Sequence, residues 1–145
     1  MNNFSPLTES NYKKVYEIEK QCFTSEAWSE TLFFDEIGDE NKYYAVYSND
    51  EGEVGFGSYV QIFDEGHILN IAVLPSHRQK GIGTKILENL IETGIKNGIS
   101  AFTLEVRVSN VAAQKLYERM GFVNVGARKK YYPDKEDAYI YWLYL

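Results

Sequence analysis

The sequence ILNIAVLP (Ile68–Pro75) is followed directly by SHRQKGIGT (Ser76–Thr84), and this junction decides the fold. The first segment is short, apolar and rich in β-branched residues, and it ends at a proline, so it predicts a buried strand. After Gly81 the apolar residues recur at helical spacing, at Ile82, Ile86, Leu87, Leu90, Ile91 and Ile95. They predict one face of an amphipathic helix that runs to about Gly98.

The loop between this strand and this helix is suited to binding an anion. The first N–H groups of a helix have no partner within it, and the helix dipole adds about half a positive charge there. Gly81 and Gly83 lack a Cβ and allow close approach to the backbone, while Arg78 and Lys80 add positive charge. These features predict a phosphate site. An ordinary glycine-containing turn explains the same residues, and the loop alone does not separate the two interpretations.

Two well-known phosphate motifs do not fit this loop. A P-loop requires Gly-Lys followed by Ser or Thr, which the sequence lacks, and the dinucleotide fingerprint requires a third glycine where Ile86 stands. The remaining pattern is Arg78-x-x-Gly81-x-Gly83 after a strand that ends in Ile-Ala-Val. It resembles the acetyl-CoA signature of the GNAT N-acetyltransferases, in which the loop amides and the helix N-terminus hold the pyrophosphate of CoA.

The composition predicts a single globular domain over residues 1–145, with 44% hydrophobic and 15% aromatic residues. The net charge of −6 argues against a nucleic-acid partner. No apolar run approaches the ~20 residues of a membrane span, and the N-terminus lacks the pattern of a signal peptide. One cysteine, Cys22, and two histidines, His67 and His77, favour a cytoplasmic protein without a metal site. The oligomeric state stays open.

The remaining chain predicts alternating strands and helices in the order β–α–α–β–β–β–α–β–α–β–β. We expect strands at about 4–7, 43–47, 54–62, 68–74, 101–108, 123–131 and 137–145. We expect helices at about 8–22, 29–37, 82–98 and 109–120. This order predicts an α/β fold with one mixed sheet and helices on both faces, and the GNAT resemblance implies that the sheet is mostly antiparallel.

Glu105 is the first candidate for catalysis. It lies between Thr103 and Arg107 on the polar face of a strand whose other face is apolar. If the polar face opens on a cleft, Glu105 can act as a general base, directly or through a water molecule. The alternative is a salt bridge from Glu105 to Arg107 or to a lysine on a neighbouring strand.

Tyr117 is the second candidate. Asn110 and Tyr117 are seven residues apart, so they project from the same helix face, ~10 Å apart along its axis. With an ordinary pKa of ~10, a phenol is a suitable proton donor to a departing thiolate. Packing of Tyr117 in the core beside Leu116 is the alternative.

With the loop motif included, four motifs occur together in the GNAT order and spacing, at Asn70–Val73, Arg78–Gly83, Leu104–Asn110 and Ala113–Phe122. They resemble the RimI-type subfamily, bacterial enzymes that acetylate the N-terminal alanine of a small-subunit ribosomal protein. Tyr131–Pro133 with Glu136–Ala138 resembles the C-terminal segment of that subfamily, and Trp28–Ser29 resembles a segment near its start.

This resemblance implies roles for individual residues. It makes Glu105 the general base and Tyr117 the general acid. It implies that acetyl-CoA contacts Ile71, Ala72, Val73, Arg78, Gln79, Lys80, Gly81, Ile82, Gly83, Thr84 and Asn110. Thr84 departs from the family pattern, in which a cation often follows the second glycine, and Lys85 is the candidate replacement. The residues expected to shape the acceptor site are Trp28, Tyr131 and Tyr132, with core packing as the alternative for Trp28.

Three functions follow as hypotheses. The first is transfer of an acetyl group from acetyl-CoA to the N-terminal α-amine of a protein, with the ribosomal alanine as the main candidate. The second changes the acceptor to a lysine side chain, a polyamine or a small-molecule amine. The third is a non-catalytic CoA-binding interaction module, and the presence of both Glu105 and Tyr117 in register counts against it.

Overall fold

The computed structural model describes residues 3–23 and 29–145. The strands are β1 (Phe4–Ser5), β2 (Lys42–Asn49), β3 (Gly52–Ile62), β4 (Glu65–Val73), β5 (Ala101–Arg107), β6 (Val123–Arg128) and β7 (Ala138–Tyr144). The helices are α1 (Tyr12–Cys22), α2 (Glu30–Glu36), α3 (Ile82–Lys96) and α4 (Val111–Arg119), with a 3-10 turn at Pro75–His77. The predicted order of elements is confirmed.

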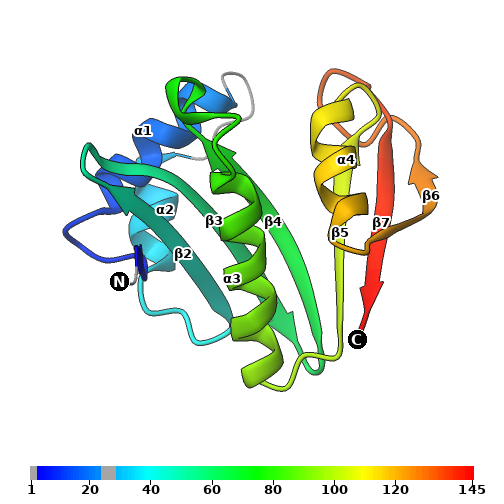
Figure 1. The fold of residues 1–145 in the computed structure, drawn as a ribbon, viewed down its shortest axis with the longest axis horizontal. Helices are drawn as coiled ribbons and strands as arrows, with labels where there is room; N and C mark the ends of the chain where they lie inside the picture. The colour runs from blue at the N-terminus through cyan, green and yellow to red at the C-terminus, as the bar shows by residue number, and fades with distance from the viewer. Residues whose placement is uncertain (1–2, 24–28) are drawn as a thin grey trace.

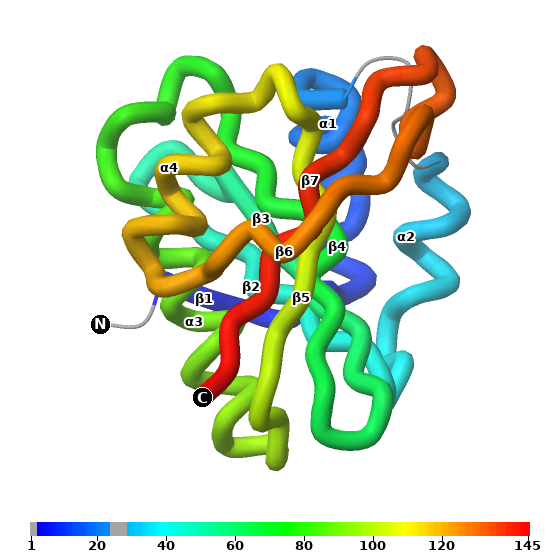
Figure 2. The backbone as a smooth tube through the Cα atoms, turned by 90° about the vertical axis from the view of Figure 1, so that its right-hand side faces the viewer, coloured from blue at the N-terminus to red at the C-terminus, as the bar shows by residue number. Residues whose placement is uncertain are grey.

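The strands form one seven-stranded sheet in the order β1-β2-β3-β4-β5-β7-β6. The pairing of β4 with β5 is parallel, and the other pairings are antiparallel. Helices α3 and α4 cover one face of the sheet, and α1 and α2 cover the other (Figure 1 and Figure 2). The predicted α/β fold with a mixed, mostly antiparallel sheet is therefore confirmed.

Each face of the sheet has its own hydrophobic core. On the α3 and α4 side, buried residues include Ile86, Leu87, Leu90, Phe102, Leu104 and Val106. On the α1 and α2 side they include Val15, Ile18, Phe33, Val46 and Phe56. The expected apolar face of α3 is wrong at one position: Ile95 is 51% exposed. Gly94 faces the core there, so closely that a Cβ on it would lie 2.4 Å from Phe102.

Strands β4 and β5 pair over a short length only. The paired positions are Glu65 with Ala101, Gly66 with Phe102 and His67 with Thr103. Beyond His67 the two strands diverge (Figure 1). On the other edge of β4 the pairing with β3 shifts register between Ser58 and Tyr59, which leaves Leu69 as an extra residue in a β-bulge. The sheet is therefore open between β4 and β5 beyond these three paired positions, over more than half the length of either strand.

Several strand boundaries differ from the sequence prediction by one or two residues, and two differ by three. β4 begins at Glu65 rather than at 68, because Glu65 and Gly66 already pair with both β3 and β5. β6 ends at Arg128 rather than at 131, because Lys130 takes a left-handed conformation with φ of 52° and its N–H donates to Oδ1 of Asp137. None of the helices among the described residues combines the length and the apolar character needed to cross a membrane.

Candidate active site

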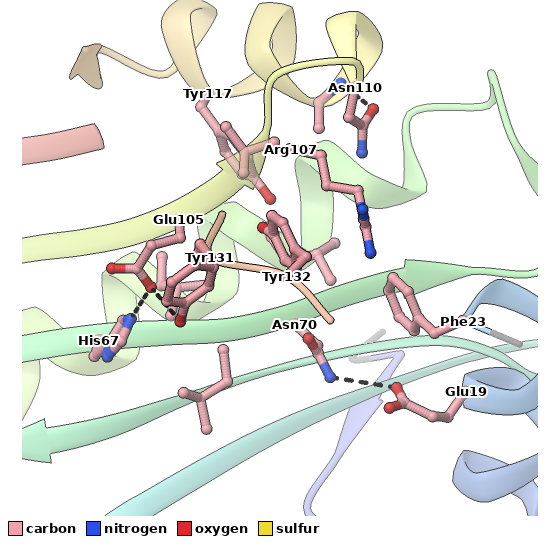
Figure 3. A pocket seen from close by; sticks show the side chains of 15 residues that line it. Glu19, Phe23, His67, Asn70, Glu105, Arg107, Asn110, Tyr117, Tyr131 and Tyr132 are labelled. Atoms are coloured by element: carbon pink, nitrogen blue, oxygen red, sulfur yellow. Dashed lines mark hydrogen bonds and ion pairs between the residues drawn. The ribbon is translucent and has the colours of Figure 1, made fainter. Parts of the chain in front are cut away.

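A cavity of about 330 Å³ lies where β4 and β5 diverge. Its walls bring together residues that the sequence analysis singled out from different motifs, namely Glu105, Asn110, Tyr117, Tyr131 and Tyr132 (Figure 3). Glu105 comes from β5 and Tyr117 from α4, which covers one face of the sheet. Because the sheet is open at this point, side chains from both of its faces reach one space.

The Glu105 carboxylate is enclosed and surrounded by hydrogen-bond donors. Its side chain is 9% exposed, and its Oε1 lies 2.7 Å from Nε2 of His67. The Tyr131 hydroxyl lies 3.5 Å from the same oxygen, and Nε of Arg128 lies 3.7 Å from Oε2. The hydrogen bond from His67 lowers the pKa of Glu105 against the opposing effect of burial, and Arg128 and Tyr131 lower it further. The carboxylate is therefore ionised at neutral pH.

The alternative interpretation of Glu105, a salt bridge to Arg107 or to a lysine, is not formed among the described residues, where the basic side chains beside Glu105 are His67 and Arg128. Arg107 instead binds Asp134 and Glu136 through Nη1, at 2.9 Å and 2.7 Å. Its guanidinium also lies 4.0 Å from the centre of the Tyr132 ring. Arg107 thereby fastens the segment between β6 and β7 beside the cavity.

Tyr117 packs with its ring in the core and also lines the cavity. Its ring is 8% exposed and packs against Phe122 and Tyr141, at ring-centre distances of 5.9 Å and 6.3 Å. Its hydroxyl points into the cavity (Figure 3) and has no hydrogen-bond partner among the described residues. Burial raises the pKa of Tyr117, so the phenol keeps its proton at neutral pH.

A second cavity of about 510 Å³ adjoins the first, and Asn110 lines both. It is lined by most of the predicted acetyl-CoA residues, namely Ile71, Ala72, Val73, Arg78, Gln79, Gly81, Ile82, Gly83, Thr84 and Asn110. Lys80 is exposed and does not line it. The two cavities together run from the N-terminus of α3 to Glu105 and Tyr117.

The loop before α3 presents its backbone to this second cavity. Gly81 is the N-cap of α3, with φ of 79° and no side-chain cap on the helix. A Cβ on Gly81 would meet nothing within 4 Å, and one on Gly83 would meet only Leu116 at 3.6 Å, among the described residues. The first amides of α3 are thus open to an anion, and the residues present fit a pyrophosphate.

Two of these residues, and Lys85 as the candidate replacement for the missing cation, make contacts within the chain. Nε of Arg78 donates to the carbonyl oxygen of Val73 at 2.9 Å, so its guanidinium is turned back onto the end of β4. The Asn110 Oδ1 accepts from the N–H of Ala113 at 3.2 Å and caps α4. Nζ of Lys85 lies 5.9 Å from the ring centre of Tyr47, and Lys85 does not line the second cavity.

The open edge of β4 offers backbone hydrogen bonds to the cavities. The N–H of Leu74 donates to the carbonyl of Val54 on β3 at 2.9 Å. Backbone groups alternate in direction along a strand, so those of Ile71 and Val73 are turned away from β3 and toward β5. Since β5 pairs with β4 only as far as His67, these groups border the open part of the sheet, where the Val73 carbonyl already accepts from Nε of Arg78.

The sequence analysis did not name His67 or Arg128 as part of the site. Their positions depend on the register between strands that are distant in sequence, and no local pattern signals it. Trp28, the remaining predicted acceptor residue, lies outside the described residues. Within residues 3–23 and 29–145, no group of three His, Cys, Asp or Glu side chains is arranged to hold a metal ion.

Residues 12–122 match the Acetyltransferase (GNAT) family. The chain belongs to this family. The match begins at the start of α1 and extends beyond α4. It therefore includes β4, α3, β5 and α4, which together supply residues to the two cavities. The GNAT assignment makes the protein an acetyl-CoA-dependent N-acetyltransferase, as the sequence analysis expected.

Individual GNAT relatives match nearly the whole chain. The [ribosomal protein bS18]-alanine N-acetyltransferase of Escherichia coli (strain K12) is 35% identical over 144 residues, which cover 97% of this chain and 95% of the relative. The crystal structure of the ribosomal-protein-S18-alanine N-acetyltransferase from Escherichia coli superposes with a TM-score of 0.89 and covers 99% of this chain and 94% of that one. A chain in the crystal structure of the NatC complex bound to Gag peptide and CoA is 25% identical and superposes with a TM-score of 0.82. The superposition covers 98% of this chain and 97% of that one.

Proposed function

We propose that this protein transfers the acetyl group of acetyl-CoA to the N-terminal α-amine of a protein, and that its acceptor is the N-terminal alanine of ribosomal protein bS18. The observation that carries the proposal is the pair Glu105 and Tyr117 on one cavity, which adjoins the cavity at the N-terminus of α3. The 35% identity to the bS18-alanine N-acetyltransferase of Escherichia coli over 97% of the chain supports this acceptor.

In the proposed reaction Glu105 is the general base and Tyr117 the general acid. The ionised Glu105 carboxylate takes a proton from the α-ammonium group, directly or through a water molecule. The free amine attacks the thioester carbonyl, a C–N bond forms, and the C–S bond breaks. The Tyr117 hydroxyl gives its proton to the departing thiolate, and the second proton that the nitrogen loses as the amide forms restores the phenol. An α-amine has a pKa of ~7.7–8.0 and a lysine ~10.4, so the α-amine loses its proton far more readily at neutral pH.

We assign the binding of acetyl-CoA to the chain's open backbone groups. The amides from Gln79 to Thr84 face the pyrophosphate at the N-terminus of α3, and Asn110 contacts the cofactor between the two cavities. Backbone groups of Ile71 and Val73 pair with the pantetheine arm and polarise the thioester carbonyl. Holding donor and acceptor in adjoining cavities removes much of the entropic barrier to their reaction.

A steady-state assay with a peptide carrying the first residues of bS18 tests the proposal. We expect acetylation of this peptide and none of the same peptide with a blocked N-terminus. Acetylation of the blocked peptide would indicate a lysine side chain as the acceptor. Acetylation of a polyamine alone would exclude a protein acceptor. Binding of acetyl-CoA without transfer to any amine would indicate the interaction module.

Variants test the roles of the two residues. Glu105→Gln and Tyr117→Phe are each expected to lower kcat by ~10²-fold or more. Glu53→Gln is the control, because Glu53 is a partly exposed glutamate on β3 that lines neither cavity. If Glu105→Gln and Tyr117→Phe both keep the kcat of the wild type, the assignment of base and acid is wrong.

A further inference from the structure

His67 is held against Glu105 by the short parallel pairing of β4 with β5. It lies opposite Thr103, at the last paired position before the strands diverge. Nε2 of His67 is 2.7 Å from Oε1 of Glu105. The Glu105 side chain is 9% exposed and that of His67 is 33% exposed. The contact therefore joins an enclosed carboxylate to an imidazole that reaches solvent.

Several groups face the Glu105 carboxylate, and the contact with His67 is the shortest. Arg128 approaches Oε2 from β6 at 3.7 Å, and the Tyr131 hydroxyl approaches Oε1 from the segment after β6 at 3.5 Å. The charge of Glu105 also acts on Tyr132. An ionised carboxylate only accepts hydrogen bonds, so Nε2 of His67 carries the proton in this contact.

We propose that His67 is a positioning residue for the reaction, whose Nε2–H holds Oε1 of Glu105 so that the carboxylate stays turned toward the cavity and receives the proton of the amine. The inference rests on the proposed role of Glu105 as the base. It assigns to His67 no contact with substrate. The imidazole acts only through the carboxylate that it orients.

The reason for this role is the competing cation on β6. Arg128 is 56% exposed and belongs to the outermost strand of the sheet. Without the hydrogen bond from His67, Arg128 is the strongest remaining partner of the carboxylate and draws it outward, away from the acceptor amine. A displacement of about 1 Å in a catalytic group costs ~10²-fold in rate.

Two substitutions separate the hydrogen bond from the volume of the side chain. His67→Leu keeps a similar bulk and removes the donor. His67→Gln places an amide N–H at nearly the reach of Nε2 and restores the donor without an imidazole. We expect His67→Leu to lower kcat by about tenfold or more with an unchanged KM for acetyl-CoA. We expect His67→Gln to recover most of the lost kcat.

A second measurement is independent of activity. In ¹³C NMR titrations of the glutamate carboxyls, the Glu105 signal is identified by its loss in Glu105→Gln. We expect the pKa of Glu105 to rise in His67→Leu, because the hydrogen bond that favours the charged form is lost while burial remains. In His67→Gln we expect it to stay low.

The outcomes are distinct. If the wild type acetylates the peptide and His67→Leu changes neither kcat nor the Glu105 titration, the inference is wrong. It is also wrong if His67→Gln is as impaired as His67→Leu, because the hydrogen bond is then not what matters. If the wild type acetylates no α-amine, the proposed function fails, and the titration still reports whether His67 governs the state of Glu105.

Discussion

The guanidinium of Arg107 lies 4.0 Å from the centre of the Tyr132 ring, and this contact ties the segment after β6 to the strand that carries Glu105. Arg107 also binds Asp134 and Glu136 in that segment. Glu136 in turn accepts the N–H of Ser109 at 2.9 Å, just beyond β5. One arginine thus fixes the wall of the cavity that Tyr131 and Tyr132 form.

Removing this arginine is expected to weaken use of the acceptor. Arg107→Gln removes the cation that holds Tyr132, a contact worth about 1–2 kcal/mol when partly enclosed, so kcat/KM for the peptide falls about tenfold. The KM for acetyl-CoA is expected to be unchanged. Lys129→Gln is the control, since Lys129 pairs with Asp137 in the same segment but is 83% exposed. Equal effects of the two substitutions would contradict the role of Arg107.

Tyr117→Phe and Tyr141→Phe are expected to show opposite effects. Removing the Tyr117 hydroxyl is expected to lower kcat by ~10²-fold or more, because the proposed general acid is lost. Stability should stay nearly unchanged, because this hydroxyl has no hydrogen-bond partner among the described residues. The Tyr141 hydroxyl donates to Oε2 of Glu118 at 2.8 Å. Its removal costs about 1 kcal/mol of stability and spares kcat. Kinetics and urea unfolding of both variants check this, and a fall in kcat for Tyr141→Phe alone would refute it.

Stability is expected to fall in alkaline solution. Burial raises the pKa of Tyr117, and it raises that of Tyr132 to about 12. The unfolded chain loses these phenol protons first, near the ordinary value of ~10, so it binds fewer protons than the folded chain as the pH rises further. The free energy of unfolding therefore decreases above about pH 10.

Urea midpoints measured from pH 8 to pH 11 test this expectation, and Tyr117→Phe should show a shallower fall than the wild type. A midpoint that stays constant over this interval would show that these phenols titrate alike in the folded and unfolded chains.

Gly81 and Gly98 provide a matched pair for the cofactor loop. Both have positive φ, 79° and 88°, and a Cβ on either meets nothing within 4 Å among the described residues. Alanine at either position should cost about 1–2 kcal/mol of stability, because an L side chain disfavours this conformation. Only Gly81→Ala places a methyl group on the loop before α3, so only this variant should weaken acetyl-CoA binding, by about tenfold.

Calorimetric titration with acetyl-CoA at a temperature where both variants are folded gives the comparison. Indistinguishable dissociation constants for Gly81→Ala and Gly98→Ala would remove the loop from the cofactor site.

The parts of the fold that depend on local periodicity could be predicted from the sequence. The spacing of Ile82, Ile86 and Leu90 gives the buried face of α3, and alternation along β5 separates Glu105 from Leu104 and Val106. These patterns arise because neighbouring positions in one element face fixed directions, which needs no knowledge of the rest of the chain.

The cavity itself depends on contacts between distant segments. Leu69 is an ordinary apolar residue in sequence, and only the register between β3 and β4 makes it a bulge. The contact of His67 with Glu105 depends on the register between β4 and β5, across the intervening α3. The orientation of Arg78 toward the carbonyl of Val73 likewise has no local signal. The cavity could therefore be anticipated only through the family resemblance.

Strand β7 lies between β5 and β6, although it is the last strand in chain order. A growing polypeptide that still lacks residues 138–144 leaves the outer edge of β5 without its partner and gives β6 nothing to pair with. Synthesis must therefore pass Tyr144 before the wall built from Tyr131 and Tyr132 can settle beside Glu105. A prematurely terminated polypeptide that ends before β7 would be inert even though it contains every motif that we expect to contact acetyl-CoA.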